Sequence, residues 1–417
     1  MAPMNPAACF LARRMALLFL LLAGTAALAT ADEVTTPWIS LSGSGLITLP
    51  GTSTLERGRF NAGFTVDNQD RDPLKLDVVD VSLAWVAGLR PGLETYGHAV
   101  VSRAVAVSPR STLFPSPIDI VVPRGRPVPQ RPYYPQYTPI PYVNRTGRSQ
   151  VGQFLPGDAV LGLKRTLRAP GGRVPGLAAS AEIKLPLAWG LADLQGGAGT
   201  GAVDERARMT AQWGGGSRSV VASVAYTHRG TPSWGDRVIV FDPAGSVDVQ
   251  DLPMRLPDEM GFGLGLREAV TPRVALVAEV TKAAEVGGRT HAFREPGPLD
   301  VVAGAQVRWR GAAITGGLRY HANSVPRMTR YASPLGGLAD LSQVGDADLM
   351  PYLSAIGASG AVPFLRHRGQ SALQIPDGGP PLPDGARILP ADLTIRAHDQ
   401  VGYMLVCGWT FGSVKRR

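Results

Sequence analysis

Residues Gly58–Asp67 read GRFNAGFTVD, and this stretch decides the fold class. Its apolar side chains stand at every second position, and polar side chains or glycine fill the positions between them. Successive side chains of a β-strand point to opposite faces, so this period places all the apolar side chains on one face. The stretch therefore predicts a strand with one face in an apolar environment and the other in a polar one.

Segments with the same alternation recur from Arg57 to Phe411, and the gaps between them alternate in length. The short gaps are 88–92, 169–176, 214–217, 270–272 and 310–311; the long ones are 106–156, 188–203, 229–258, 284–298 and 323–400, and only the outer gap 68–75 is modest. Outer-membrane barrels have short periplasmic turns and long extracellular loops. We therefore predict an all-β fold, a closed antiparallel transmembrane β-barrel of about 12 strands, with roughly 10 to 14 as the alternatives.

Two of the outer loops are large. The loop at 106–156 is rich in proline, arginine and tyrosine, which favours extended polyproline geometry. The loop at 323–400 contains a predicted short helix near Asp346–Ile356, and a further hairpin hidden in it would raise the strand number to about fourteen.

The ends of the chain predict export and a periplasmic start. Arg13 and Arg14 precede an apolar run that ends in small residues, which predicts a cleaved signal peptide over residues 1–31. We expect a periplasmic lead-in over 32–56, the barrel over 57–411 and a basic tail over 412–417, in the cell outer membrane of a Gram-negative bacterium.

Aromatic side chains mark the inner membrane interface. Four tryptophans stand on the apolar face near the end of a descending strand, where one edge of the ring is wet and its body is buried. The last strand adds a terminal aromatic, which resembles the assembly signal of outer-membrane barrels. The predicted aromatic girdle is Trp85, Trp213, Trp309, Trp409 and Phe411.

The polar strand faces carry charges of both signs, with cations in excess. Two interpretations stay open: a water-filled pore that favours anionic or polar solutes, and a plugged barrel whose charges form internal ion pairs. The formal net charge of +9 is scattered along the chain, which does not favour nucleic-acid binding. The predicted lumen-lining residues are Arg59, Lys164, Glu182, Lys184, Arg206, Arg208, Arg267, Glu279, Arg308 and Arg319.

Catalysis and metal binding are not favoured by the sequence. The cluster Tyr320–Ser324 has histidine, asparagine and serine, but the serine stands three positions from His321, on the opposite strand face. The six histidines are dispersed without the spacing of metal ligands. We expect neither an enzyme nor a protein with a metal or another cofactor.

Two stretches resemble known barrel families. Gly157–Lys164, followed by Ala181–Pro186 and the glycine-rich 196–201, is similar to the transporter-type barrels linked to phenol degradation (the MetA-pathway group). Ser44–Pro50 and Glu56–Phe64 resemble the N-terminus of YjbH-type barrels associated with exopolysaccharide export.

Three alternatives stay open for the function. The first is an outer-membrane channel or transporter for small polar or anionic solutes. The second is a non-conducting barrel accessory to exopolysaccharide export or surface binding, and the third is an exported soluble β-protein. For a barrel, the expected partners are outer-membrane lipid, the barrel-assembly machinery and a small solute or polysaccharide.

Overall fold

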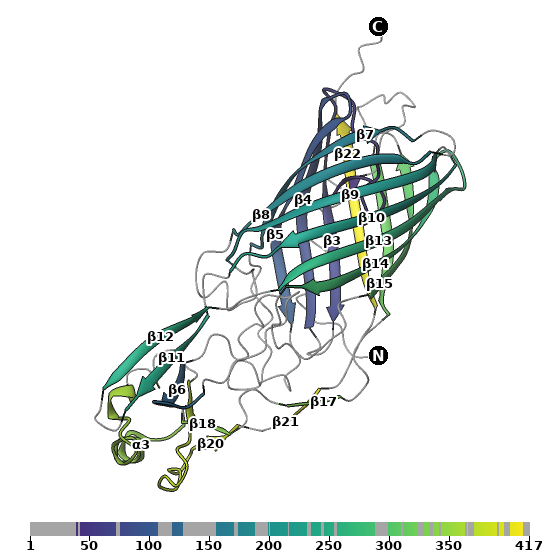
Figure 1. Cartoon of the computed structure of the whole chain (residues 1–417). Helices are drawn as coiled ribbons and strands as arrows, with labels where there is room; N and C mark the ends of the chain where they lie inside the picture. The colour runs from purple at the N-terminus through teal and green to yellow at the C-terminus, as the bar shows by residue number, and fades with distance from the viewer. Residues whose placement is uncertain are drawn as a thin grey trace, which may run out of the picture.

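Twelve antiparallel strands close into a barrel in the computed structural model (Figure 1). The structure describes residues 39–411 except 41, 72–75, 107–118, 128–155, 171–173, 188–198, 200, 216, 232–234, 243–245, 254–256, 288–298, 310–311, 323–328, 333–336, 342, 363–364, 366–370, 390–391 and 396–400. The predicted signal peptide and basic tail lie outside the described residues. The barrel strands are β3 (Phe60–Arg71), β4 (Leu76–Arg90), β5 (Leu93–Ala106), β7 (Ala159–Arg168), β8 (Gly176–Leu185), β9 (Asp204–Gly215), β10 (Arg218–His228), β13 (Asp258–Ala269), β14 (Val274–Val286), β15 (Leu299–Trp309), β16 (Ala312–His321) and β22 (Val401–Phe411).

The last strand closes the barrel on the first. β22 pairs antiparallel with β3, with Phe411 opposite Phe60 and Cys407 opposite Phe64. Every other barrel strand pairs with its two neighbours along the chain, so the closed sheet has no free edge. The predicted fold class is therefore confirmed. Gly92, in the turn after β4, and Gly214, at the end of β9, have positive φ, a conformation in which a side chain would be strained.

The apolar strand faces point outward. The large hydrophobic side chains that are exposed belong mainly to alternating barrel positions, such as Leu83, Leu163, Leu264 and Leu318. The polar residues between them are buried, among them Glu94, Lys164 and Gln306. An apolar outer face and a polar interior define a barrel that lies in a membrane. Within the described ranges, no helix is both long and apolar enough to span a membrane.

A second sheet is built from three of the long loops and lies beyond the loop end of the barrel (Figure 1). It was not predicted. Its strands have the order β12-β11-β6-β19-β18-β20. Their bounds are β6 (Asp119–Pro123), β11 (Gly235–Phe241), β12 (Val247–Pro253), β18 (Leu338–Asp340), β19 (Ser371–Gln374) and β20 (Arg387–Ile388).

The helix predicted near Asp346–Ile356 is α3 (Asp346–Ala355), and it packs against this second sheet. Its Leu349 and Leu353 pack in one apolar cluster with Val121 of β6 and Ile239 of β11, and the 3-10 turn η2 (Ser359–Ala361) adds Ala361. A separate two-stranded sheet pairs β17 (Thr329–Ala332) with β21 (Asp392–Ile395). The strands described in loop 323–400 thus add none to the barrel, because all of them pair outside it.

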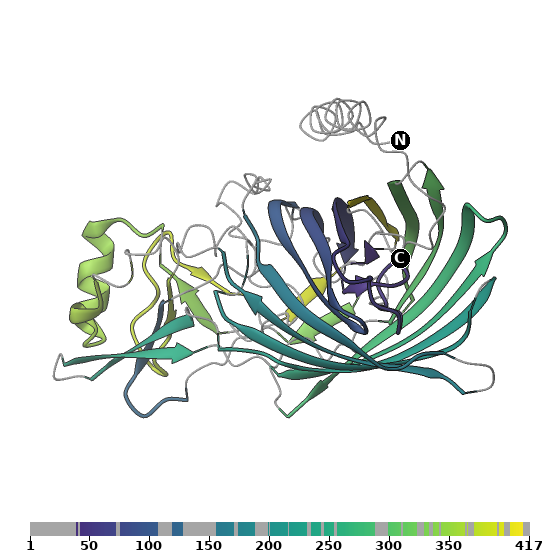
Figure 2. The ribbon, with the colours of Figure 1, turned by 90° about the horizontal axis from the view of Figure 1, so that it is seen from above.

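The N-terminal segment lies inside the barrel. It contains the short hairpin β1 (Ile39–Ser40) and β2 (Gly43–Ser44), and Figure 2 shows it within the ring of barrel strands. Leu46, Ile47, Leu49 and Leu55 are each at most 6 % exposed. The described part of 32–56 therefore differs from the periplasmic lead-in that we expected: its apolar side chains avoid water by entering the lumen. We call residues 42–56 the plug segment.

Candidate functional site: the plugged lumen

A buried ion pair anchors the plug segment to the barrel wall. Glu94 of β5 and Lys164 of β7 are inward-facing, and Lys164 Nζ lies 2.8 Å from Glu94 Oε1. Ser44 joins both partners: its backbone N–H donates to Glu94, and its carbonyl oxygen accepts from Lys164 at 2.7 Å. The N–H of Leu55 also donates to Glu94, at 2.7 Å. One carboxylate therefore fixes both ends of the plug segment.

A second carboxylate holds the middle of the plug segment. Glu279 of β14 is 1 % exposed and accepts hydrogen bonds from the backbone N–H of Ile47 at 2.7 Å and of Thr48 at 3.0 Å. The Thr48 hydroxyl donates to the same carboxylate. Burial of a charged carboxylate is costly unless such donors replace water, and the plug backbone supplies them.

Apolar packing fills the space between these two anchors. Leu46, Ile47, Leu49 and Leu55 form a single cluster with inward-facing side chains from β4, β5, β10, β14, β15 and β22. Two glycines of β13 make room for them: a Cβ added to Gly263 would lie 2.4 Å from Leu49 Cδ2, and one added to Gly265 would lie 2.4 Å from Leu46 Cδ1. The wall is therefore shaped to the plug segment.

Further ion pairs line the lumen toward the loop end. Glu182 of β8 pairs with Arg206 Nη1 at 3.3 Å and with Arg208 Nη1 at 3.6 Å, and it accepts a hydrogen bond from Tyr96 at 2.9 Å. Lys184 lies between Asp158 and Asp204, at 3.2 and 2.7 Å. Arg319 pairs with Asp67 at 2.9 Å.

The remaining predicted lumen residues lie at the short-turn mouth. Arg59, which is 7 % exposed, pairs with Glu56 at 3.0 Å. Arg267 and Arg308 stand on the inward-facing positions of β13 and β15, close to the strand ends. This mouth thus carries three arginines. Glu94 stands near the same end, as the second residue of β5, and Glu279 lies further inside β14; both acids bind the plug segment.

Three of the predicted girdle tryptophans share one row of strand pairs. Trp309 is opposite Ala312, Ala312 is opposite Trp409, and Trp409 and Trp85 both face Ala62 of β3. Strands of a closed barrel are tilted relative to the barrel axis, so residues of one such row lie at successively different heights along that axis. Trp213 lies outside the row, near the end of β9, and the ring of Phe411 contacts that of Phe60. A role at the membrane interface stays a prediction for all five aromatics.

Sequence patterns missed the partners of the lumen charges. Ser44, Thr48 and Thr52 bind Glu94, Glu279 and Gln212, yet they lie in a segment without period-two alternation. Asp67, the partner of Arg319, is the last residue of the stretch Gly58–Asp67 and lies within β3. The sequence signal that could have pointed to the plug segment is the apolar Leu46–Leu49 next to small polar residues, in a lead-in that lies ahead of the first barrel strand.

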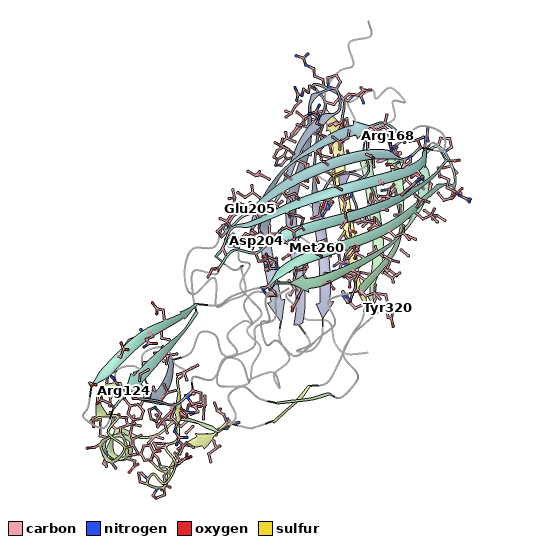
Figure 3. All side chains as sticks on the ribbon, in the orientation of Figure 1. Arg124, Arg168, Asp204, Glu205, Met260 and Tyr320 are labelled. Carbon is pink, nitrogen blue, oxygen red and sulfur yellow. The ribbon has the colours of Figure 1, made fainter. Side chains whose placement is uncertain are left out.

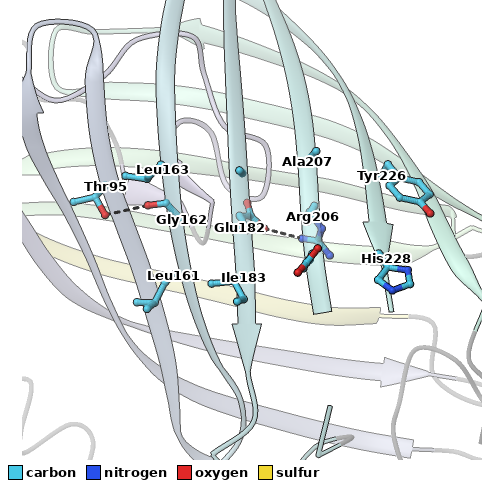
Figure 4. Close-up of a pocket in the computed structure, with 12 residues that line it drawn as sticks. Thr95, Leu161, Gly162, Leu163, Glu182, Ile183, Arg206, Ala207, Tyr226 and His228 are labelled. Carbon is cyan, nitrogen blue, oxygen red and sulfur yellow. Dashed lines mark hydrogen bonds and ion pairs between the residues drawn. The ribbon is translucent and has the colours of Figure 1, made fainter. Parts of the chain in front are cut away.

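A pocket of about 530 Å³ lies along β7, β8, β9 and β10 (Figure 4). Its lining combines exposed Leu161, Leu163 and Ile183 with the Glu182–Arg206 pair. Thr95 donates to the Gly162 carbonyl at 3.0 Å beside it. The ladders from β7 to β9 are continuous through this region, so the pocket is a recess of the wall and not a gap between strands.

The closed sheet, its apolar outer face and its polar interior define the class of protein: an integral β-barrel of the bacterial outer membrane. No family model matches the chain, and no curated protein matches it in sequence.

Solved structures of outer-membrane channels resemble the chain at low identity. The COG4313 outer membrane channel from Pseudomonas putida F1 has a TM-score of 0.43 and 10 % identity, covering 88 % of this chain and 100 % of that one. The NanC porin has a TM-score of 0.35 and 4 % identity, covering 84 % and 98 %. The P. putida toluene transporter TodX has a TM-score of 0.33 and 12 % identity, covering 88 % and 94 %. At these scores the likeness carries no argument about the function of this chain.

Proposed function

We propose that this protein is an outer-membrane channel for small polar or anionic solutes, whose lumen is narrowed by the plug segment. The observation that carries the proposal is the charged inner face of the closed barrel, with Arg59, Arg267 and Arg308 at its short-turn mouth. Charges that line a narrow lumen act through low dielectric surroundings and bias which ions enter.

Reversal of two mouth arginines tests the proposal. The variant Arg267→Glu/Arg308→Glu should lose anion preference, measured as the reversal potential across a planar bilayer under a salt gradient. Arg218→Glu/Arg273→Glu changes the charge equally at exposed positions of the same end and is the matched control. Unchanged selectivity in a conducting Arg267→Glu/Arg308→Glu barrel would contradict a role of these residues in the pore.

A second candidate is a non-conducting barrel accessory to exopolysaccharide export or surface binding. The observation that favours it is the filled lumen: the plug segment and the ion pairs of Glu94, Glu182 and Glu279 occupy the barrel interior. A protein with the heat-modifiable migration of a folded barrel that shows no conductance would support this candidate over the channel.

We propose the barrel-assembly machinery as a partner during biogenesis, because β22 ends in the aromatic Phe411. Phe411→Ala should reduce the amount of folded protein in the outer membrane, measured by heat-modifiable migration. Thr410→Ala is the neighbouring control. Equal amounts of folded protein for Phe411→Ala and the wild type would argue against recognition through this residue.

A further inference from the structure

The two ends of the barrel differ in charge. At the short-turn end, the exposed arginines are Arg57, Arg90, Arg165, Arg168, Arg218 and Arg273. The described acids there are Glu56, Glu268 and the inward-facing Glu94, which pair with Arg59, Arg218 and Lys164. The loop end carries acids such as Asp204 and Glu205. Figure 3 shows Arg168 at one end of the barrel and Asp204 and Glu205 toward the other.

Three of these arginines form a cluster on the outward face. Arg90 of β4 and Arg165 of β7 both pair with Leu93 of β5, one from each side. Strands lie about 4.8 Å apart, so the two Cα atoms are separated by roughly 10 Å, within reach of two arginine side chains that converge on one group. Arg168 follows in β7 and pairs with the outward-facing Leu177 of β8.

Among the described residues, no acidic side chain shares the outward face with the cluster; Glu94, next to Leu93, points into the lumen and pairs with Lys164. The turn-end segments 88–93, 163–170 and 174–177 contain no aspartate or glutamate. Within the part of the chain that the structure describes, no carboxylate pairs with the three guanidinium groups; Arg168 Nε donates to the Pro175 carbonyl at 2.8 Å. The described residues therefore leave the positive charge of this patch without a neutralising carboxylate.

Apolar side chains surround the same arginines. Leu89, Leu163, Leu167 and Val174 are 47, 51, 52 and 51 % exposed. Guanidinium groups next to exposed leucines on the outward face of a barrel suit the depth at which acyl chains give way to headgroups. A soluble acidic partner would neutralise the arginines but would leave the leucines exposed to water. A lipid supplies a phosphate for the arginines and acyl chains for the leucines.

We propose that Arg90, Arg165 and Arg168 form a binding site for the phosphate of an anionic glycerophospholipid in the periplasmic leaflet. The guanidinium groups take the phosphodiester, for which arginine is suited by its planar set of donors. The acyl chains lie along Leu163 and Leu167. The site is on the outside of the barrel and is independent of conduction through the lumen.

Native mass spectrometry of the protein released from nanodiscs of equal phosphatidylglycerol and phosphatidylethanolamine tests the site. We expect the wild type to retain phosphatidylglycerol in excess, by about tenfold, since each basic residue near a charged surface contributes attraction. Arg90→Gln/Arg165→Gln/Arg168→Gln should retain both lipids equally. Arg57→Gln/Arg218→Gln/Arg273→Gln, with the same change of charge at the same end, should keep the preference.

Three results would overturn the proposal. One is equal retention of both lipids by the wild type, and another is an equal loss of preference in both triple variants, which would indicate only the general charge of this end. The third is displacement of phosphatidylglycerol from the wild type by excess inorganic phosphate, which would indicate an anion site without lipid specificity. Heat-modifiable migration confirms that each variant is folded.

Discussion

Lys164 Nζ lies 2.8 Å from Glu94 Oε1 inside the barrel, and the two side chains are 1 % and 0 % exposed. The pair is not a simple bridge between strands, because Ser44 of the plug segment bonds to both partners. Each charge thus depends on the plug segment for part of its solvation, and the plug segment depends on both charges for its position.

Loss of either charge should destabilise the folded barrel by about 3–5 kcal/mol, because it leaves the other charge buried and unpaired. Glu94→Gln should cost more than Lys164→Met: without Lys164 the carboxylate keeps donors from Ser44 and Leu55, whereas without Glu94 the ammonium keeps only two oxygens of Ser44. Urea unfolding in micelles measures both free energies.

The double variant Glu94→Gln/Lys164→Met tests the coupling. We expect the double variant to lose less stability than the sum of the losses in the two single variants, because it leaves no unpaired charge in the barrel. Strict additivity of the two single effects would contradict a coupled pair.

Glu279→Gln should loosen the middle of the plug segment. A neutral amide accepts fewer of the hydrogen bonds that Ile47 and Thr48 donate, and its NH₂ group faces donors. We expect faster backbone hydrogen exchange at 46–49, measured by mass spectrometry. Glu285→Gln, at an exposed position of the same strand, should leave this exchange unchanged; equal exchange in wild type and Glu279→Gln would argue against the anchor.

Side chains placed at the β13 glycines should compete with the plug segment for space. Gly263→Val and Gly265→Val would meet Leu49 and Leu46, and overpacking of this kind costs about 1–3 kcal/mol. We expect increased proteolysis or hydrogen exchange of residues 42–56. Gly261→Val is the control, since its nearest neighbour, Ala225 Cβ, lies 3.6 Å from the added Cβ. An identical response of all three variants would show that the plug segment is not what the glycines accommodate.

Tyr352→Phe should stabilise the second sheet by up to about 1 kcal/mol. The Tyr352 hydroxyl is buried without a hydrogen-bond partner among the described residues, and its removal relieves that cost. Burial raises the pKa of Tyr352, so the folded protein keeps the proton at a pH where the unfolded chain has lost it. The wild type should therefore lose stability as the pH rises above about 10, and the phenylalanine variant should lose less. Hydrogen exchange in α3 measures both effects, and an equal pH dependence of the two proteins would contradict them.

The barrel could be predicted because its signal is local. Period two in each strand, as in Phe60–Val66, fixes which side chains face lipid, and the short turns fix which strands are neighbours. The closure of β22 on β3 follows from the even strand number and the membrane environment, without any contact between them in sequence.

The plug segment and the second sheet could not be predicted, because their contacts are distant along the chain. Ile47 reaches Glu279 across 232 residues, and Ser44 reaches Glu94 across 50. β6 pairs in parallel with both β11 and β19, which come from different loops. No local period in the sequence encodes such pairings. The sequence of loop 106–156 therefore revealed only a high proline content, and the sequence of the lead-in revealed only a lack of alternation.

The conductance of a plug deletion tests the central claim most directly. Single-channel recordings should compare the full chain with a variant that lacks residues 43–52, after both show the migration of a folded barrel. We predict a clearly larger unitary conductance for the deletion, because the segment held by Glu94 and Glu279 then no longer fills the lumen. Equal conductance of the two folded proteins would contradict the account.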